Sequence, residues 1–145
     1  MNELKLTIEL IPSTAWFNNL RNMVGQKKWD DIRKKCYREA NYRCEICGGT
    51  GNKWPVECHE KWEFVDNKII LKGFIALCPS CHEVKHIGLA SVRGRFKHAR
   101  THFIRVNKVK PEVADQYIEQ AFQLYKERSN EQWELCIDSV YDYLN

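Results

Sequence analysis

Hydrophobic and polar positions repeat along the chain with two periods, which predicts both helices and strands. Trp29, Ile32 and Cys36 lie three and four residues apart in a basic segment, which predicts an amphipathic helix before Cys44. Residues 56–64 alternate with period two, and a run rich in Ile and Leu follows at 68–77. With an Asp-Asn pair between them, these runs predict two antiparallel strands. A proline then suits the first turn of a helix that begins near Cys81.

The second half of the chain has the helical period throughout. Apolar residues at alternating spacings of three and four predict one amphipathic helix over residues 89–106. Another helix is expected to begin at Pro111. The end segments, residues 4–10 and 133–141, are both typical of strands, and we expect them to pair. The chain is therefore placed in the α+β class.

Length and composition favour one domain formed by residues 1–145. Hydrophobic residues make up 43% of the chain and charged residues 29%, as in soluble globular proteins. No apolar run approaches the roughly 18 residues of a membrane span, and the N-terminal residues do not resemble a signal peptide. We therefore expect a cytoplasmic location and no membrane partner.

Four of the seven cysteines fall into two Cys-x-x-Cys pairs. An odd number of cysteines without an export signal favours metal binding over disulfides. Two such pairs can supply the four thiolates of a tetrahedral Zn²⁺ site, and Gly48 and Gly49 can turn the first pair toward the metal. We predict a structural zinc bound by Cys44, Cys47, Cys78 and Cys81. Cys36 and Cys136 are expected to be small buried residues.

Three stretches, "YRCEICGG", "ECHEKW" and "ALCPSCHEVKH", together resemble the HNH endonuclease family. The resemblance implies a zinc-stabilised ββα-metal core over about residues 27–87. From the hydrophobic pattern we expect flanking amphipathic helices and paired terminal strands around this core, with a helical and C-terminal elaboration over residues 88–145. The resemblance also implies metal-dependent hydrolysis of DNA phosphodiester bonds. In this family a histidine on the first strand is the general base, and His59 occupies that place. By the same resemblance, His82 binds the catalytic ion, expected to be Mg²⁺ or another divalent cation.

Three positions leave the catalytic assignment open. His86 lies four residues after His82 on one helix face, so it could bind the same ion or cap the helix end. Cys58 stands where the family commonly has a metal-binding aspartate or histidine, and a thiolate suits zinc better than magnesium. Gly73 stands where many members have asparagine. The alternative hypothesis is a catalytically silent, zinc-stabilised module that binds nucleic acid or a protein partner.

Charge is unevenly distributed along the chain. The net charge is +4, but residues 84–111 contain eight Lys or Arg and no Asp or Glu. Residues 112–145 contain eight Asp or Glu. We expect the basic segment to bind nucleic acid, in particular double-stranded DNA, unless it is a solvated helix face that pairs with this acidic tail. The predicted contacts are Arg93, Arg95, Lys97, His98, Arg100, His102 and Arg105. The sequence also leaves a homodimer open.

Overall fold

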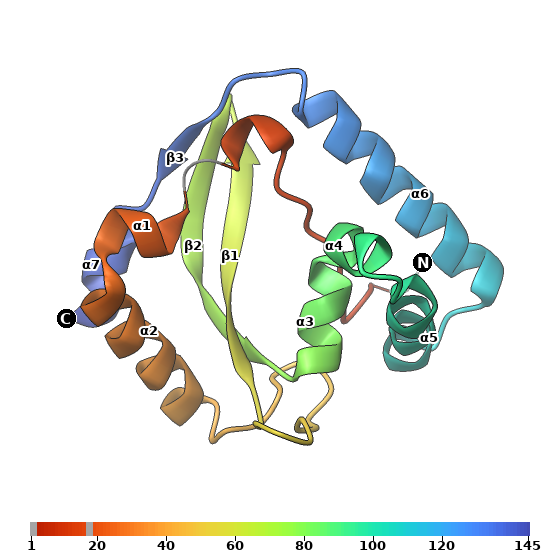
Figure 1. The fold of residues 1–145 in the computed structure, drawn as a ribbon, viewed down its shortest axis with the longest axis horizontal. Helices are drawn as coiled ribbons and strands as arrows, with labels where there is room; N and C mark the ends of the chain where they lie inside the picture. Colours follow the sequence, from red (N-terminus) through yellow and green to blue (C-terminus); the bar gives the residue numbers. More distant parts are fainter. Residues whose placement is uncertain (1–2, 17–18) are drawn as a thin grey trace.

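The computed structural model describes residues 3–16 and 19–145, and it has a mixed α+β fold (Figure 1). A 3₁₀ turn at Ser13–Ala15 is followed by α1 (Leu20–Val24), α2 (Gln26–Glu39), β1 (Glu57–Val65), β2 (Lys68–Leu77), α3 (Pro79–Lys85), α4 (Ile87–Val92), α5 (Phe96–Asn107), α6 (Pro111–Arg128), β3 (Glu134–Cys136) and α7 (Ser139–Leu144). In the described ranges, no helix is both long enough and apolar enough to cross a lipid bilayer.

The hairpin of β1 and β2 forms the centre of the fold. Its strands pair antiparallel from Glu57 opposite Leu77 to Val65 opposite Lys68, as the alternation predicts. Asp66 and Asn67 both have positive φ, which gives the hairpin a tight turn whose twist matches that of the strands. A bulge between the pairs Lys61–Gly73 and Trp62–Leu71 leaves Lys72 without a partner, and Gly73 beside it has a φ of +152°, which favours glycine. Gly73 therefore has a backbone role here.

Helices cover both faces of the hairpin and create two apolar cores (Figure 1). On one face, Trp29, Ile32 and Cys36 of α2 pack against the sheet, as their spacing predicts. On the other, residues of α3, α5 and α6 pack together, and Phe103 is fully buried there. Since β1 is at the edge of the three-stranded sheet, one of its sides has no neighbouring strand. This free side borders the site described below.

The prediction that the two ends of the chain form paired strands is wrong. Leu6 and Ile8 are buried in the core of α3 to α6, but their backbone N–H groups donate to Asn107 Oδ1 (2.9 Å) and the Tyr117 hydroxyl (3.1 Å). Side chains thus satisfy backbone groups that a strand would satisfy by pairing. At the other end, β3 is only three residues long and pairs parallel with β2, and α7 follows it.

The helix predicted over residues 89–106 is divided into α4 and α5. Gly94 has a φ of +74°, and Arg95 N–H donates to the Ala90 carbonyl at 2.8 Å, which closes the turn between the two helices. Positive φ is the conformation that glycine adopts without steric cost. As a result Val92 and Leu89 are 84% and 48% exposed, instead of facing the core.

Candidate metal centres and the adjoining pocket

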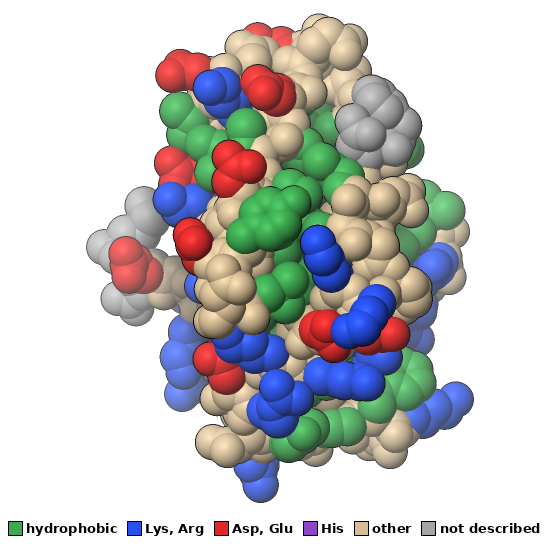
Figure 2. Space-filling view, turned by 90° about the vertical axis from the view of Figure 1, so that its left-hand side faces the viewer, with side chains coloured by type: hydrophobic (Ala, Val, Ile, Leu, Met, Phe, Trp, Pro, Cys, Tyr) green, Lys and Arg blue, Asp and Glu red, His purple; other side chains and the backbone are tan. Residues whose placement is uncertain are grey.

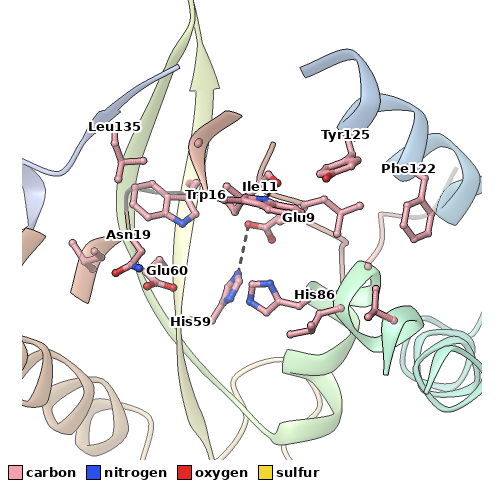
Figure 3. Close-up of a pocket in the computed structure, with 17 residues that line it drawn as sticks. Glu9, Ile11, Trp16, Asn19, His59, Glu60, His86, Phe122, Tyr125 and Leu135 are labelled. Atoms are coloured by element: carbon pink, nitrogen blue, oxygen red, sulfur yellow. Dashed lines mark hydrogen bonds and ion pairs between the residues drawn. The ribbon is translucent and has the colours of Figure 1, made fainter. Parts of the chain in front are cut away.

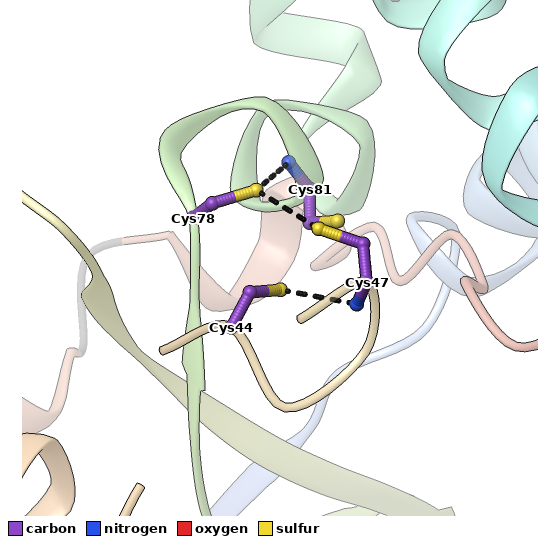
Figure 4. Close-up of side chains that lie close together, drawn as sticks. All are labelled: Cys44, Cys47, Cys78 and Cys81. Atoms are coloured by element: carbon purple, nitrogen blue, oxygen red, sulfur yellow. Dashed lines mark hydrogen bonds between the residues drawn. The ribbon is translucent and has the colours of Figure 1, made fainter. Parts of the chain in front are cut away.

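The four predicted zinc cysteines come together between the hairpin and α3 (Figure 4). All four Sγ atoms lie within 4.8 Å of one another, and Cys47 and Cys78 are 3.7 Å apart. A tetrahedral zinc with Zn–S bonds of about 2.3 Å requires S–S distances of roughly 3.8 Å. The cluster could therefore hold a zinc ion with little rearrangement.

Backbone amides surround these sulfurs. Cys47 N–H donates to Cys44 Sγ at 3.5 Å and Cys81 N–H donates to Cys78 Sγ at 3.4 Å, so each Cys-x-x-Cys turn repeats the same contact. Gly49 N–H donates to Cys47 Sγ at 3.4 Å, after Gly48 with φ +77°. Amide N–H groups that point at a thiolate stabilise its charge.

The thiols also influence one another. Hydrogen bonds from Cys78 and Cys81 lower the pKa of Cys44 strongly, since they stabilise its thiolate. The same contact with Cys44 raises the pKa of Cys78 to about 11 and raises that of Cys81 further. Four thiolates at these distances would repel one another, so all four can be ionised together only with a cation among them.

His102 lies behind the cysteines, in contact with Cys81. Its predicted role as a nucleic-acid contact is therefore corrected. His102 is 6% exposed, and its Nε2 lies 3.2 Å from Cys81 Sγ. Its Nδ1 lies 3.0 Å from Nη2 of Arg105, which can only donate. Nδ1 must then accept a hydrogen bond. Nε2 therefore carries the ring proton and donates a hydrogen bond to the sulfur. Burial, and then Arg105, lower the pKa of His102, in keeping with this neutral ring.

Three histidines form a second cluster, from β1 and α3. Ligand nitrogens of His59, His82 and His86 lie within 4.8 Å of one another, and the ring centroids are 4.8–5.2 Å apart. His86 is the C-cap residue of α3, but its ring faces the other two. The spacing of four residues thus brings both helix histidines to one place, and the strand adds the third.

Glu57 orients His82. Its Oε1 lies 2.9 Å from His82 Nδ1, and its Oε2 accepts from Trp54 Nε1, also at 2.9 Å. The hydrogen bond with His82 lowers the pKa of Glu57, so the carboxylate accepts and Nδ1 donates. The lone pair of His82 Nε2 remains for a metal ion, and such carboxylate–histidine pairs commonly support metal ligands. Strand alternation could have identified Glu57, since it shares a face with His59.

An N-terminal carboxylate completes the surroundings of the histidines. Glu9 Oε1 lies 3.8 Å from His59 Nε2, while its Oε2 accepts from buried Lys85 at 2.5 Å. Burial alone would raise the pKa of Glu9, but His59 and Lys85 outweigh it and lower the pKa to about 2. No local sequence signal indicates Glu9, which is fifty residues from His59 and lies in a segment expected to be a strand.

The histidine nitrogens suit a metal ion. His59 is 2% exposed, and both its ring nitrogens are buried without a hydrogen-bond partner in the described residues. Burial, and then His82 and His59, lower the pKa of His86 to about 3, so this ring is neutral at physiological pH. Buried nitrogens without partners are costly unless something accepts their lone pairs. Three imidazoles favour Zn²⁺, Ni²⁺, Cu²⁺ or Fe²⁺ over Mg²⁺.

The structure does not bring Cys58 to this cluster. As the residue before His59 on a strand, it points to the opposite face, where it packs with Cys36 of α2. The Cys36 contact and burial raise its pKa strongly. Cys58 is therefore a buried thiol in the core beneath α2, and the proposed ligand role is corrected.

A pocket of about 770 Å³ adjoins the histidine cluster along the free side of β1 (Figure 3). His59 and His86 contribute to its lining, and the rest comes from the N-terminal segment, α1, β1, α4, α6 and β3. Its walls include the aromatic residues Trp16, Trp62, Phe122 and Tyr125 and the polar residues Glu9, Asn19 and Glu60.

The predicted nucleic-acid contacts are largely engaged within the protein. Arg95 and His98 both contact Glu83, and Arg100 makes two contacts with Asp115. Of the predicted Lys and Arg contacts, only Arg93, Lys97 and Arg105 lack an acidic partner among the described residues. A second basic surface lies on α2, in the lower part of Figure 2. Its cations are Lys27, Lys28, Lys34, Lys35 and Arg38.

Comparison with models of protein families, with curated proteins and with solved structures gave no match. The geometry of the two clusters and the pocket is therefore the basis for the function proposed next.

Proposed function

We propose that the protein is a metal-dependent phosphodiesterase acting on nucleic acid, as its resemblance to HNH endonucleases implies. The observation that carries this proposal is the convergence of His59, His82 and His86 within 4.8 Å beside an open pocket. The order of elements supports it, because a hairpin and the following helix supply the histidines while the cysteine pairs bracket the hairpin. Catalytic metal sites differ from structural ones in this openness.

In the proposed assignment, His82 and His86 hold a transition-metal ion and His59 is the general base. When bound, such an ion stabilises negative charge on the phosphate and leaving oxygen. His59 would accept the proton of the attacking water. The imidazolium so formed would lie 3.8 Å from the Glu9 carboxylate, which favours the charged ring. Lys85 Nζ and the Thr7 hydroxyl both donate to that carboxylate and hold it in place.

Metal-dependent cleavage tests the proposal. Supercoiled plasmid and labelled oligonucleotides are incubated with the zinc-loaded protein and added Mn²⁺, Ni²⁺, Zn²⁺ or Mg²⁺. We expect cleavage with a transition metal and a loss of about 10²–10⁴-fold in His59→Ala. Lys61→Ala is the matched control, because Lys61 is on the same strand and parity but exposed.

Isothermal titration with Ni²⁺ separates the roles of the histidines. His59→Ala should still bind the second metal, whereas His86→Ala should not. If His59→Ala loses metal binding as well, all three histidines are ligands and another group must be the base. Absence of cleavage by the metal-loaded wild type on every substrate would reject the enzyme.

The second candidate is the silent zinc module. It is favoured by the donor set of the histidine cluster, which contains no carboxylate ligand for Mg²⁺. In that case the histidine cluster would bind a metal without cleavage of any substrate.

We place the salt-dependent part of nucleic-acid binding on α2, since five cations gather there and two of them, Lys34 and Arg38, form no salt bridge with the described residues. Replacing both with Ala should reduce the slope of log affinity against log salt by roughly 1 to 2. Arg95 and Arg100, which contact acids, are the matched controls and should change it less. Equal slopes for the two double variants would contradict this placement.

A further inference from the structure

The pocket beside the histidine cluster has aromatic walls that are open to solvent. Trp16 stacks on Tyr125 with ring centroids 6.2 Å apart and an interplanar angle of 28°, yet it remains 61% exposed. Leu89 and Val92 are also exposed at this pocket. Exposed apolar side chains that gather around a concavity commonly mark a binding site. One face of Trp16 is supported by Tyr125, and much of the rest of its indole is available to a ligand.

The charges of the pocket determine which part of a nucleic acid it can accept. Among the lining residues that the structure describes, Glu9 and Glu60 are acidic and none is Lys or Arg. Phosphate is therefore disfavoured along the walls. A nucleobase is uncharged and flat, and stacking on an aromatic side chain is worth about 1–3 kcal/mol per base. The volume of about 770 Å³ is in the usual range for small-molecule sites and is sufficient for a base with its sugar.

The geometry points to an unpaired nucleobase of single-stranded nucleic acid as the occupant of this pocket, stacked on Trp16, with the adjacent phosphodiester at the histidine cluster. This inference rests on the proposed function and gives its substrate class. Duplex DNA, which the charge of the sequence suggested, would have to extrude a base first, at a cost of a few kcal/mol. A single strand reaches the pocket without that cost.

Two polar side chains could select the base. The Asn19 side-chain oxygen accepts from Asn22 N–H at 2.9 Å as the helix cap of α1, so its amide NH₂ is left to donate. The Glu60 carboxylate can only accept. Cytosine and adenine present an amino donor at the edge where thymine and guanine present a carbonyl oxygen. The pocket should therefore favour cytosine over thymine.

Binding of labelled 12-nucleotide strands, measured by fluorescence anisotropy with the zinc-loaded full chain and no second metal, tests the inference. We expect a single strand to bind more tightly than the duplex of the same sequence. Trp16→Ala should weaken single-strand binding about tenfold. Tyr42→Ala is the matched control, because Tyr42 is similarly exposed (51%) but lies outside the pocket, and it should bind as wild type does.

Equal affinity for single strand and duplex, or an unchanged affinity in Trp16→Ala, would overturn the inference. A dinucleotide that binds as tightly as the 12-mer would also overturn it, since the pocket would then be a site for small nucleotides and not for a single strand. These outcomes are independent of cleavage. If stacking is observed without metal-dependent cleavage, the proposed function fails alone, and if duplex is cleaved equally by Trp16→Ala, the pocket assignment fails alone.

Base selection gives a second readout on the folded protein. Wild type should bind oligo-dC more tightly than oligo-dT. Glu60→Gln, which can both donate and accept, should reduce that preference while leaving the far-UV circular dichroism unchanged. No preference in wild type would overturn the role of Glu60.

Discussion

The cysteine cluster and the histidine cluster lie at the two ends of α3, and they differ in how their donor atoms are satisfied. Each Cys-x-x-Cys turn supplies its own amide contacts, and His102 adds a further donor. The histidine cluster instead contains a ring with two buried nitrogens that have no partner in the described residues, and it opens on a pocket. A closed set of ligands is typical of a structural metal and an open one of a reactive metal.

One short helix, α3, thus contributes to a closed cluster suited to stabilising the fold and to an open cluster suited to a reaction. Cys81 and His82 are adjacent, yet one faces the sulfur set and the other the histidines. The following predictions test whether the two clusters are as distinct as their contacts indicate.

The largest effect is expected at the cysteines. Cys81→Ser should abolish the native fold, because structural zinc contributes roughly 10–16 kcal/mol in zinc-finger peptides and whole domains are stable by only about 5–15 kcal/mol. Zinc content and near-ultraviolet circular dichroism measure the loss. Cys136→Ser is the control and should keep both. A folded, metal-free Cys81→Ser would show that the cluster is not structural.

Glu9→Gln should destabilise the protein by about 3 kcal/mol, because Lys85, whose side chain is 6% exposed, loses its carboxylate partner. The lowered pKa of Glu9 means that its stabilising contribution is complete above the ordinary pKa of 4.5 and is lost as pH falls toward 2. Urea unfolding from pH 7 to pH 2 should show wild type and Glu9→Gln converging in that window. The double variant with Lys85→Met should recover part of the loss, and no recovery would contradict the pairing.

His102→Phe should weaken zinc binding by about 10–100-fold without unfolding the protein, since partners behind a metal ligand usually have effects of that size. Competition with a chromophoric chelator measures the affinity. The zinc affinity of His102→Gln, which keeps an N–H donor, should lie closer to that of wild type. Thr101→Ala, at an exposed neighbouring position, is the control and should have the zinc affinity of wild type. An affinity unchanged in His102→Phe would show that the contact with Cys81 has no role.

His59→Leu is expected to have the smallest effect on stability, and in the opposite direction. Replacement of a buried ring without hydrogen bonds should raise the unfolding free energy of protein lacking a second metal by about 1 kcal/mol. Added Ni²⁺ should stabilise wild type more than the variant. A loss of several kcal/mol in His59→Leu would instead make the histidine cluster a structural one.

Local patterns in the sequence predict much of the fold and the first cluster. Period two identifies the hairpin and period 3.6 identifies α2 and α6, because each segment buries one face. Spacing alone brings Cys44 and Cys47, or His82 and His86, to one side of a turn. Strand alternation does not predict the burial of His59, whose ring is 2% exposed because α3 packs against β1.

Contacts between distant segments could not be predicted in this way. Glu9 reaches His59 and Lys85 because α5 and α6 bind the backbone of the N-terminal segment and Glu9 N–H donates to the Lys85 carbonyl. His102 meets Cys81 because Gly94 ends one helix and starts another in a new direction. Neither of these long-range contacts produces a periodic pattern in the sequence near Glu9 or His102.

The anchoring of the N-terminal segment has a consequence for biosynthesis. Leu6 is held by Asn107 and Ile8 by Tyr117, so the partners that position Glu9 leave the ribosome about a hundred residues later. Contacts of such long sequence separation form late and slow the folding of small domains. A nascent chain would already contain both cysteine pairs and all three histidines while its acidic partner at the site is still unplaced. The site is therefore completed only after α5 and the first half of α6 have been translated.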